Sequence, residues 1–169
     1  MNKSYQQIET LTHTFEPIYN NDSRILILGS FPSVKSRENH FYYGHPQNRF
    51  WKVIASVTGN AVPVSIEEKT ELLLNNYIAI WDVIASCSIQ GSSDSSIKDV
   101  VVNDFTKILQ DSSIQAIYVN GNKAYELYHK YAEPKTGMPA IKLPSTSPAN
   151  AAWDVERLCE NWKQILTYL

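Results

Sequence analysis

The chain has 169 residues, of which 43% are apolar and 19% are charged, proportions that are ordinary for a soluble globular protein. No apolar run approaches the roughly 18 residues that a membrane-spanning helix needs, and the N-terminus lacks the charged start and apolar core of a secretory signal. We therefore expect a single domain over residues 1–169 that acts as a monomer in the cytoplasm, with no membrane partner.

The two cysteines argue against several kinds of site. Cys87 and Cys159 are too few and too far apart for a disulfide framework, a four-ligand zinc site or a four-cysteine iron–sulfur cluster. We interpret both as reduced structural thiols and predict no metal site.

The net charge of −2 hides an uneven distribution. Residues 24–52 carry a net charge of +4 and residues 134–150 carry +2, so the rest of the chain carries −8. Positive charge gathered in two segments favours a polyanionic partner, although surface loops can also collect lysines without any such function.

Strands and helices are predicted to alternate along the chain, because short apolar runs are separated by segments with helical spacing. The first run, residues 24–29 (RILILG), suits a strand buried on both faces of a parallel sheet. Helices are expected at residues 48–57 and after Ser65, which has the character of an N-cap. The remaining elements are expected as a strand at 77–84, a helix at 103–109, a strand at 114–119, a helix at 124–131, a strand at 138–143 and a helix at 151–166.

This order predicts an α/β fold, a three-layer α/β/α sandwich with a central, mainly parallel four-stranded sheet. Ligands bind such sheets beyond the carboxyl ends of the strands. That rule places the connections at residues 29–33, 82–94, 120–122 and 143–150 at one edge. The serine-rich segment 86–96 is expected to be a functional loop rather than a linker.

The loop at residues 29–33 (GSFPS) follows the first strand but lacks the glycine patterns of dinucleotide-binding and P-loop proteins. A nucleotide cofactor is therefore disfavoured, and we expect no cofactor. The loop can present backbone N–H groups and hydroxyls to a ligand, or it can be an ordinary turn between a strand and a helix.

Together with residues 41–52 (FYYGHPQNRFWK), this loop resembles the first motif of the uracil-DNA glycosylase superfamily. The pattern is most similar to the hypoxanthine-DNA (deoxyinosine) glycosylase branch, family 6, with the mismatch-specific thymine/uracil glycosylases as near relatives. Residues 143–150 (LPSTSPAN) are similar to the second motif of the superfamily, and residues 118–124 (YVNGNKA) to the segment that precedes it. The resemblance implies a DNA repair enzyme that flips a deaminated base, hypoxanthine foremost, out of the duplex and hydrolyses its N-glycosidic bond, leaving an abasic site.

One position departs from the superfamily. Most members have an Asn or Asp that positions the attacking water where this chain has Phe31. The similar branch implies that Asn48 takes over, in a positional and electrostatic role, since a carboxamide does not accept a proton near neutral pH. Asp82 and Asp94 are the carboxylate candidates for water activation, although such acids more often cap helices or turns.

The resemblance also implies roles for other residues. Tyr43 is expected to stack on the flipped base, although without the motif it would pass for an ordinary packed tyrosine. His45 is as consistent with a structural hydrogen bond as with a DNA contact, and Asn150 with a cap of the last helix. The expected base-binding residues are Gly29, Ser30, Phe31, Tyr43 and Asn120, and the expected DNA-binding residues are Pro32, Ser33, His45, Arg49, Ser145, Ser147, Pro148 and Asn150.

Other functions remain open at this point. A uracil or mismatch-specific DNA glycosylase would share both motifs, and Phe31 would also suit a catalytically weak module that only binds lesions. A small-molecule α/β enzyme is disfavoured by the two positive segments.

Overall fold

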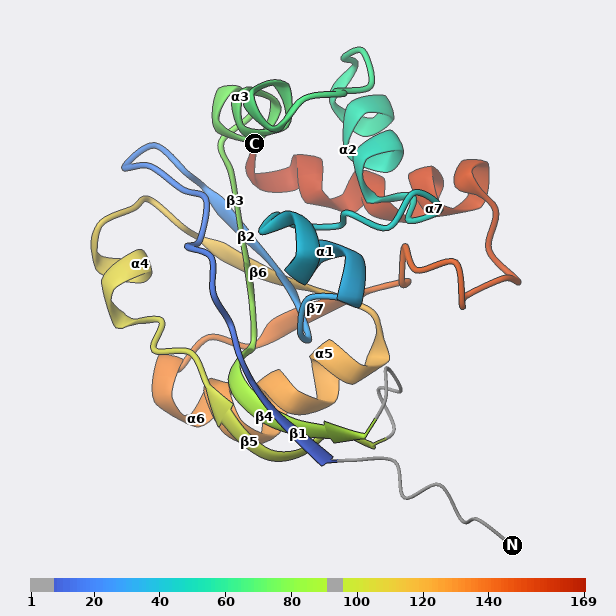
Figure 1. Cartoon of the computed structure of the whole chain (residues 1–169). Helices are drawn as coiled ribbons and strands as arrows, with labels where there is room; N and C mark the ends of the chain where they lie inside the picture. The colour runs from blue at the N-terminus through green and yellow to red at the C-terminus, as the bar shows by residue number, and fades with distance from the viewer. Residues whose placement is uncertain (1–7, 91–95) are drawn as a thin grey trace, which may run out of the picture.

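The computed structural model describes residues 8–90 and 96–169, so the carboxylate candidate Asp94 lies outside the described residues. The predicted central sheet is present and all its strands are parallel (Figure 1). Its strands are β2 (Ile25–Gly29), β3 (Ile78–Asp82), β6 (Ala116–Asn120) and β7 (Ala140–Leu143), in the spatial order β3-β2-β6-β7. Every residue of β2 is buried, as a central strand of a parallel sheet requires.

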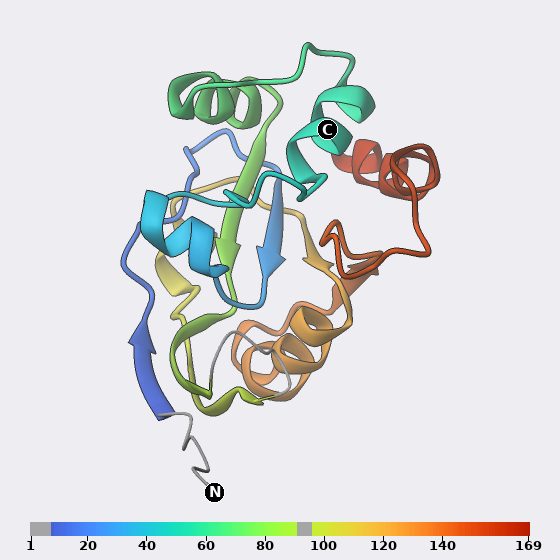
Figure 2. The ribbon, with the colours of Figure 1, turned by 45° about the vertical axis from the view of Figure 1, so that its right-hand side comes forward.

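Helices cover both faces of this sheet because successive strand residues point to opposite sides (Figure 2). Ile25 and Ile27 of β2 belong to the core on one face, and Leu26 and Leu28 belong to the core on the other. The first face is covered by α2 (Phe50–Thr58), α3 (Ile66–Asn75) and α7 (Val155–Trp162), and the second by α4 (Thr106–Gln110), α5 (Asn122–Leu127) and the π-helix Tyr128–Ala132. The three-layer α/β/α architecture is therefore confirmed.

A second, antiparallel sheet was not predicted. It contains β1 (Ile8–Thr12), β4 (Ile84–Gln90) and β5 (Lys98–Val102) in the order β1-β4-β5. The expectation of a loop from residue 82 is therefore wrong as far as Gln90, because β4 follows β3 after a single residue. The serines of this segment suggested a loop, but they are interspersed with Ile84, Cys87 and Ile89, which are buried.

Several helices begin at other residues than predicted. Asp154 caps α7 by accepting a hydrogen bond from the Arg157 N–H at 2.8 Å, so the last helix does not start at residue 151 and Asn150 is not its cap. The helix expected at residues 124–131 starts at Asn122 and continues through the π-helix into α6 (Glu133–Thr136). Ser65 caps α3 as predicted, since its hydroxyl accepts from the Glu68 N–H at 3.0 Å.

The order of the strands creates the place for a ligand. The chain passes from β2 to β3 on one side of β2 and later to β6 on the other side, so the loops that follow β2 and β6 diverge. In open α/β sheets a crevice forms at this switch in strand order. The short helix α1 (Val34–Asn39) follows β2 at this edge of the sheet. In the described part of the chain, no helix has the length and apolar character needed to cross a membrane.

Candidate active site

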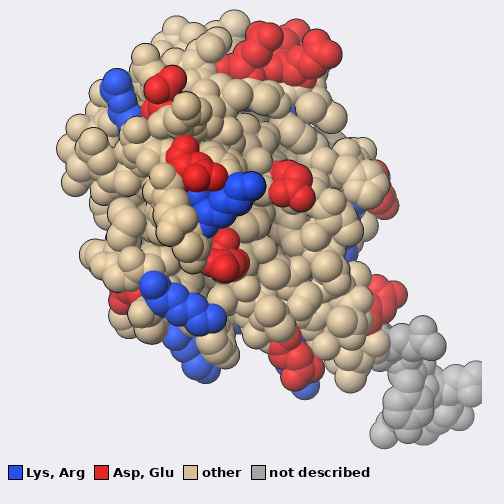
Figure 3. Space-filling view, turned by 90° about the vertical axis from the view of Figure 1, so that its left-hand side faces the viewer, with Lys and Arg blue, Asp and Glu red and all other residues tan. Residues whose placement is uncertain are grey.

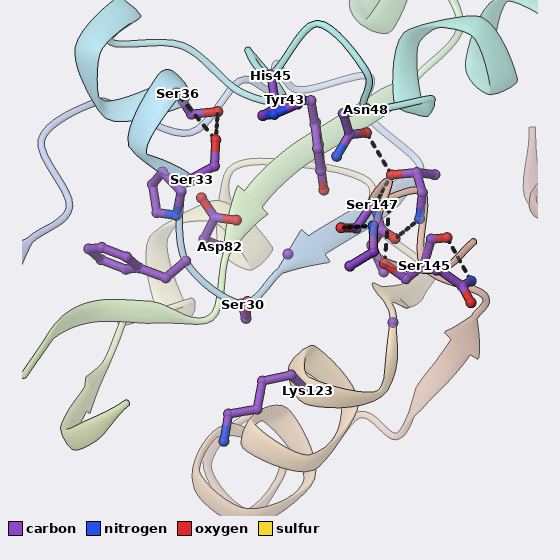
Figure 4. Close-up of a pocket in the computed structure, with 18 of the residues that line it drawn as sticks. Ser30, Ser33, Ser36, Tyr43, His45, Asn48, Asp82, Lys123, Ser145 and Ser147 are labelled. Atoms are coloured by element: carbon purple, nitrogen blue, oxygen red, sulfur yellow. Dashed lines mark hydrogen bonds between the residues drawn. The ribbon is translucent and has the colours of Figure 1, made fainter. Parts of the chain in front are cut away.

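A cavity of about 1150 Å³ lies at the carboxyl ends of the parallel strands (Figure 4). Gly29, Asp82, Asn120 and Leu143, the last residues of the four strands, all line it. Among the predicted site residues that the structure describes, all except Arg49 and Pro148 line this cavity too. Small-molecule sites usually measure roughly 300–1,000 Å³, so this cavity has room for more than a free base.

The side chain of Asn48 has a fixed orientation. Its Oδ1 accepts a hydrogen bond from the Phe50 N–H at 2.9 Å and another from the Thr146 hydroxyl at 2.9 Å. A backbone N–H can only donate, so the Phe50 contact identifies the oxygen of the carboxamide. Both described contacts of the amide are made by its oxygen, which leaves the Nδ2 hydrogens of Asn48 available to a ligand in the cavity.

Thr146, which was not among the predicted site residues, connects Asn48 to Asn120. It is fully buried, its hydroxyl accepts from Asn120 Nδ2 at 3.0 Å, and its backbone N–H donates to Asn120 Oδ1 at 3.1 Å. The hydrogen bonds therefore run in one direction, from Asn120 through Thr146 to Asn48 Oδ1. Asn120, predicted to bind the base, uses both ends of its amide to hold Thr146.

Arg49, predicted to contact DNA, binds the loop at residues 146–153. Its guanidinium donates to the backbone carbonyl oxygens of Thr146, Ser147, Asn150 and Trp153. These contacts occupy all but one of the N–H donors of the guanidinium. We infer that Arg49 acts by shaping this loop.

The same loop is fixed by further contacts to the helical layer and to itself. Trp162 of α7 donates to the Pro144 carbonyl at 2.9 Å, and Asn150 donates from Nδ2 to the Ser145 carbonyl at 3.0 Å. Gly121 allows the loop to come close, because a Cβ at this position would lie 3.0 Å from Ser145 Cβ. Ser145 and Ser147 thus line the cavity on a well-defined loop (Figure 4).

Tyr43 lies between the helical layer and the cavity. One face of its ring stacks on Phe50, with centroids 3.9 Å apart and an interplanar angle of 18°. The residue has a left-handed backbone, with φ of 52°, and its buried hydroxyl has no hydrogen-bond partner among the described residues. Burial, together with the nearby Asp82 carboxylate, raises the pKa of Tyr43 well above its usual value. The ring is thus held in place as a neutral phenol.

Asp82 is the only carboxylate among the described residues that line the cavity, and it is 4% exposed. Its Oδ2 forms a 2.8 Å hydrogen bond with His13 Nε2. Position 29 must be a glycine, since a Cβ there would lie 2.5 Å from Asp82 Oδ1 and 3.2 Å from the Tyr43 hydroxyl. His13 was missed because it follows a mostly exposed strand, β1, that gave no apolar signal.

Three predicted site residues between β2 and α2 mainly contact other residues of the protein. The Phe31 ring lies perpendicular to the His13 ring, at 85° and with centroids 6.1 Å apart, and its side chain offers no polar atom to water. Ser33, predicted to contact DNA, caps α1 by accepting from the Ser36 N–H at 3.2 Å. His45 accepts from the Gln47 N–H through Nδ1 at 3.1 Å, and its other ring nitrogen has no hydrogen bond to any residue that the structure describes.

The lining of the cavity carries positive charge. Four cationic side chains are part of it, those of Lys35, Arg37, Lys123 and Lys142, and Lys35 also forms an ion pair with Glu38 at 3.3 Å. Elsewhere, on the face shown in Figure 3, basic and acidic side chains are interspersed, with acidic ones gathered at the upper edge. Within residues 8–90 and 96–169, no three His, Cys, Asp or Glu side chains gather closely enough to hold a metal ion. The arrangement suits an anionic, elongated ligand that inserts one flat group into the cavity beyond the carboxyl ends of the strands.

The chain is similar to known proteins in sequence and in fold. A family model described as the uracil DNA glycosylase superfamily matches residues 16–169. The chain is 35% identical over 159 residues to a protein from Methanosarcina acetivorans named "Hypoxanthine DNA glycosylase", with 91% of this chain and 97% of that protein covered. A protein of the same name from Methanosarcina barkeri is 36% identical over 115 residues, which cover 66% of this chain and 72% of the relative.

A solved structure is also similar to this chain. It is a solution NMR structure of a Methanosarcina acetivorans protein described as a candidate uracil DNA glycosylase, and it is 35% identical to this chain. The TM-score is 0.77, with 89% of this chain and 93% of that chain covered.

Proposed function

Because the chain belongs to the uracil DNA glycosylase superfamily and is a DNA repair glycosylase, we propose that its substrate is hypoxanthine in DNA. The enzyme would hydrolyse the N-glycosidic bond of deoxyinosine, release free hypoxanthine and leave an abasic site. The base must first be flipped out of the duplex, since its glycosidic bond is unreachable inside the stack. The names of the two Methanosarcina relatives support this choice of base.

The observation that carries the proposal is the fixed amide of Asn48. When the bond to the sugar breaks, the sugar develops oxocarbenium character and the departing base gains negative charge. The two Nδ2 hydrogens of Asn48 are free to donate to that charge, because Oδ1 is held by Phe50 and Thr146. A preorganised donor of this kind contributes about 10²–10³-fold in rate, since it needs no reorganisation as the charge develops.

Stacking and phosphate contacts complete the proposed mechanism. The Tyr43 ring is supported from behind by Phe50, so its other face can receive the flipped base. The hydroxyls of Ser145 and Ser147 and the cations that line the cavity would hold the phosphates on either side of the flipped nucleotide. All these groups come from one chain, so we propose that the enzyme acts as a monomer.

Phe31 supports a second candidate function, a module that binds lesions without cleaving them. Its ring replaces the side chain that would position water in most of the superfamily, and it packs beside His13. Such a module would bind deoxyinosine duplexes selectively in a gel-shift assay but would release no base.

A base-release panel separates these functions. Purified protein is incubated with single- and double-stranded DNA that carries deoxyinosine, deoxyuridine or deoxyxanthosine, and free bases are quantified by chromatography. The proposal predicts release of hypoxanthine at the highest rate. Faster release of uracil would favour the uracil or mismatch-specific alternative, and selective binding with no release from any substrate would favour the binding module.

A further inference from the structure

The cavity contains a carboxylate oxygen that no described residue uses. Asp82 lines the cavity and is 4% exposed, and its Oδ2 is occupied by His13 Nε2 at 2.8 Å. Its Oδ1 accepts no hydrogen bond from any residue within 8–90 and 96–169, and it lies directly over Gly29. Because this oxygen belongs to a nearly buried carboxylate and remains accessible from the cavity, it is suited to accept an N–H group of a ligand.

From this geometry we propose that Asp82, positioned by His13, recognises the ring N–H of a deaminated base and rejects the parent base that lacks it. The inference rests on the proposed function, and it makes Asp82 a specificity determinant instead of the activator of water. The substrate class is that of lactam bases, in which a ring N–H stands next to a carbonyl group.

The chemistry of deamination explains why a carboxylate can make this distinction. Adenine and cytosine carry a ring nitrogen with a lone pair beside an amino group, whereas hypoxanthine and uracil carry a ring N–H beside a carbonyl. The N–H donates to Asp82 Oδ1, while the lone pair of the parent base faces the negative oxygen and repels it. Guanine and thymine also have the ring N–H, so their exclusion falls to other parts of the cavity.

The surroundings of Asp82 favour this role over a contact with DNA phosphates or sugar. Four cations line the cavity, as a polyanion requires, and Asp82 is the one acid among the described lining residues. Its carboxylate comes from the end of β3, next to Gly29 at the end of β2, where the two strands pair in parallel. Asp82 Oδ1 and the Tyr43 hydroxyl both lie close to Gly29, so a base that stacks on Tyr43 would present one edge to this carboxylate.

His13 acts as a positioning residue. Its side chain is 3% exposed, and its ring packs against Phe15 at 4.5 Å and Tyr42 at 6.0 Å between centroids. The hydrogen bond from Nε2 fixes one carboxylate oxygen and so directs the other into the cavity. The Phe31 ring packs at a right angle against the same His13 ring. Phe31 therefore supports base recognition by holding His13, although it cannot position water.

A cycle of enzyme and substrate changes tests the inference. Single-turnover release is measured from duplexes with deoxyinosine and with 1-methyldeoxyinosine, in which a methyl group replaces the N–H hydrogen. We expect the wild-type protein to prefer deoxyinosine by at least about 10²-fold, because a site built to bind an N–H rejects the analogue that lacks it. In Asp82→Ala we expect the preference to fall below about tenfold, since the acceptor is gone and the methyl group has room.

The contrary result is equally clear. If Asp82 activates water, Asp82→Ala will slow release from both substrates by the same factor and leave the preference unchanged, which would overturn the inference. Asp82→Asn provides a second, isosteric variant with an intermediate expected preference, because a neutral amide is a weaker acceptor. Asp111→Ala, which removes an exposed acid outside the cavity, serves as the matched control with wild-type behaviour.

Inhibition of the wild-type protein by free bases needs no variant at all. Hypoxanthine should inhibit at least about tenfold more strongly than 1-methylhypoxanthine, and equal inhibition would contradict the inference. A wild-type protein that releases no hypoxanthine from deoxyinosine would instead refute the proposed function. Release of hypoxanthine by the wild-type protein, with a preference for deoxyinosine that is unchanged in Asp82→Ala, would refute only the inference.

Discussion

Replacement of Thr146 by valine tests whether the fixed amide of Asn48 matters. The two side chains have nearly the same shape, so packing at this fully buried position is retained while the hydroxyl is lost. Two hydrogen bonds disappear with it, one from Asn120 Nδ2 at 3.0 Å and one to Asn48 Oδ1 at 2.9 Å. Each buried group that loses its partner costs about 1–3 kcal/mol, so the free energy of unfolding should fall by about 2–4 kcal/mol.

The same change should slow the reaction. Asn48 Oδ1 keeps its contact with the Phe50 N–H but loses the second contact that holds the amide plane. We expect the rate of Thr146→Val to be about tenfold lower than that of the wild-type protein, which corresponds to a loss of about 1.4 kcal/mol of transition-state stabilisation. Single-turnover release of hypoxanthine measures this rate, and urea unfolding measures the stability.

Thr146→Ser is the matched control for this prediction. Serine keeps the hydroxyl and loses only a methyl group, so the rate should stay within about threefold of wild type even though stability falls by about 1 kcal/mol. Equal rates in Thr146→Val and the wild-type protein, at temperatures where both are folded, would refute the reasoning. Equal losses of rate in the valine and serine variants would refute it too.

Two further predictions concern the loop and the stacking residue. Arg49→Ala should lower the free energy of unfolding by about 2–4 kcal/mol and weaken DNA binding, because four backbone carbonyls of the loop lose a charged donor; unchanged unfolding and binding curves would contradict this. The raised pKa of Tyr43 means that the folded state keeps a proton that the unfolded state loses, so wild-type stability should fall as pH rises above about 10. Tyr43→Phe should show a shallower fall, measured by urea unfolding from pH 8 to 11, and an identical slope would argue against a buried neutral phenol.

The central sheet was predictable because its inner strands, β2 and β6, are apolar on both faces. The runs that became β2 and β6 are almost entirely buried, and a continuous apolar run of that length has few other solutions. The second sheet was not predictable in this way. Its strand β1 is mostly exposed, and β4 mixes serines with buried apolar residues across two irregularities in its pairing with β5.

The position of the site followed from the motifs, but its hydrogen bonds did not. Asn48 and Thr146 are 98 residues apart in sequence and meet only because two connections converge at one edge of the sheet. His13 and Asp82 are 69 residues apart, and nothing in the sequence near His13 marks it as part of a pocket. Arg49 stands in the motif beside Asn48, yet sequence alone cannot distinguish a phosphate ligand from a residue that binds backbone carbonyls.

The most direct test of the account is single-turnover release of hypoxanthine from a deoxyinosine duplex by wild-type protein and by Asn48→Ala. The Asn75→Ala variant, which removes an exposed amide at the end of α3, is the matched control. We predict release by the wild-type and Asn75→Ala proteins, and a rate about 10²–10³-fold lower in Asn48→Ala with DNA binding retained. Release by Asn48→Ala at the wild-type rate would contradict the role that we give to its amide.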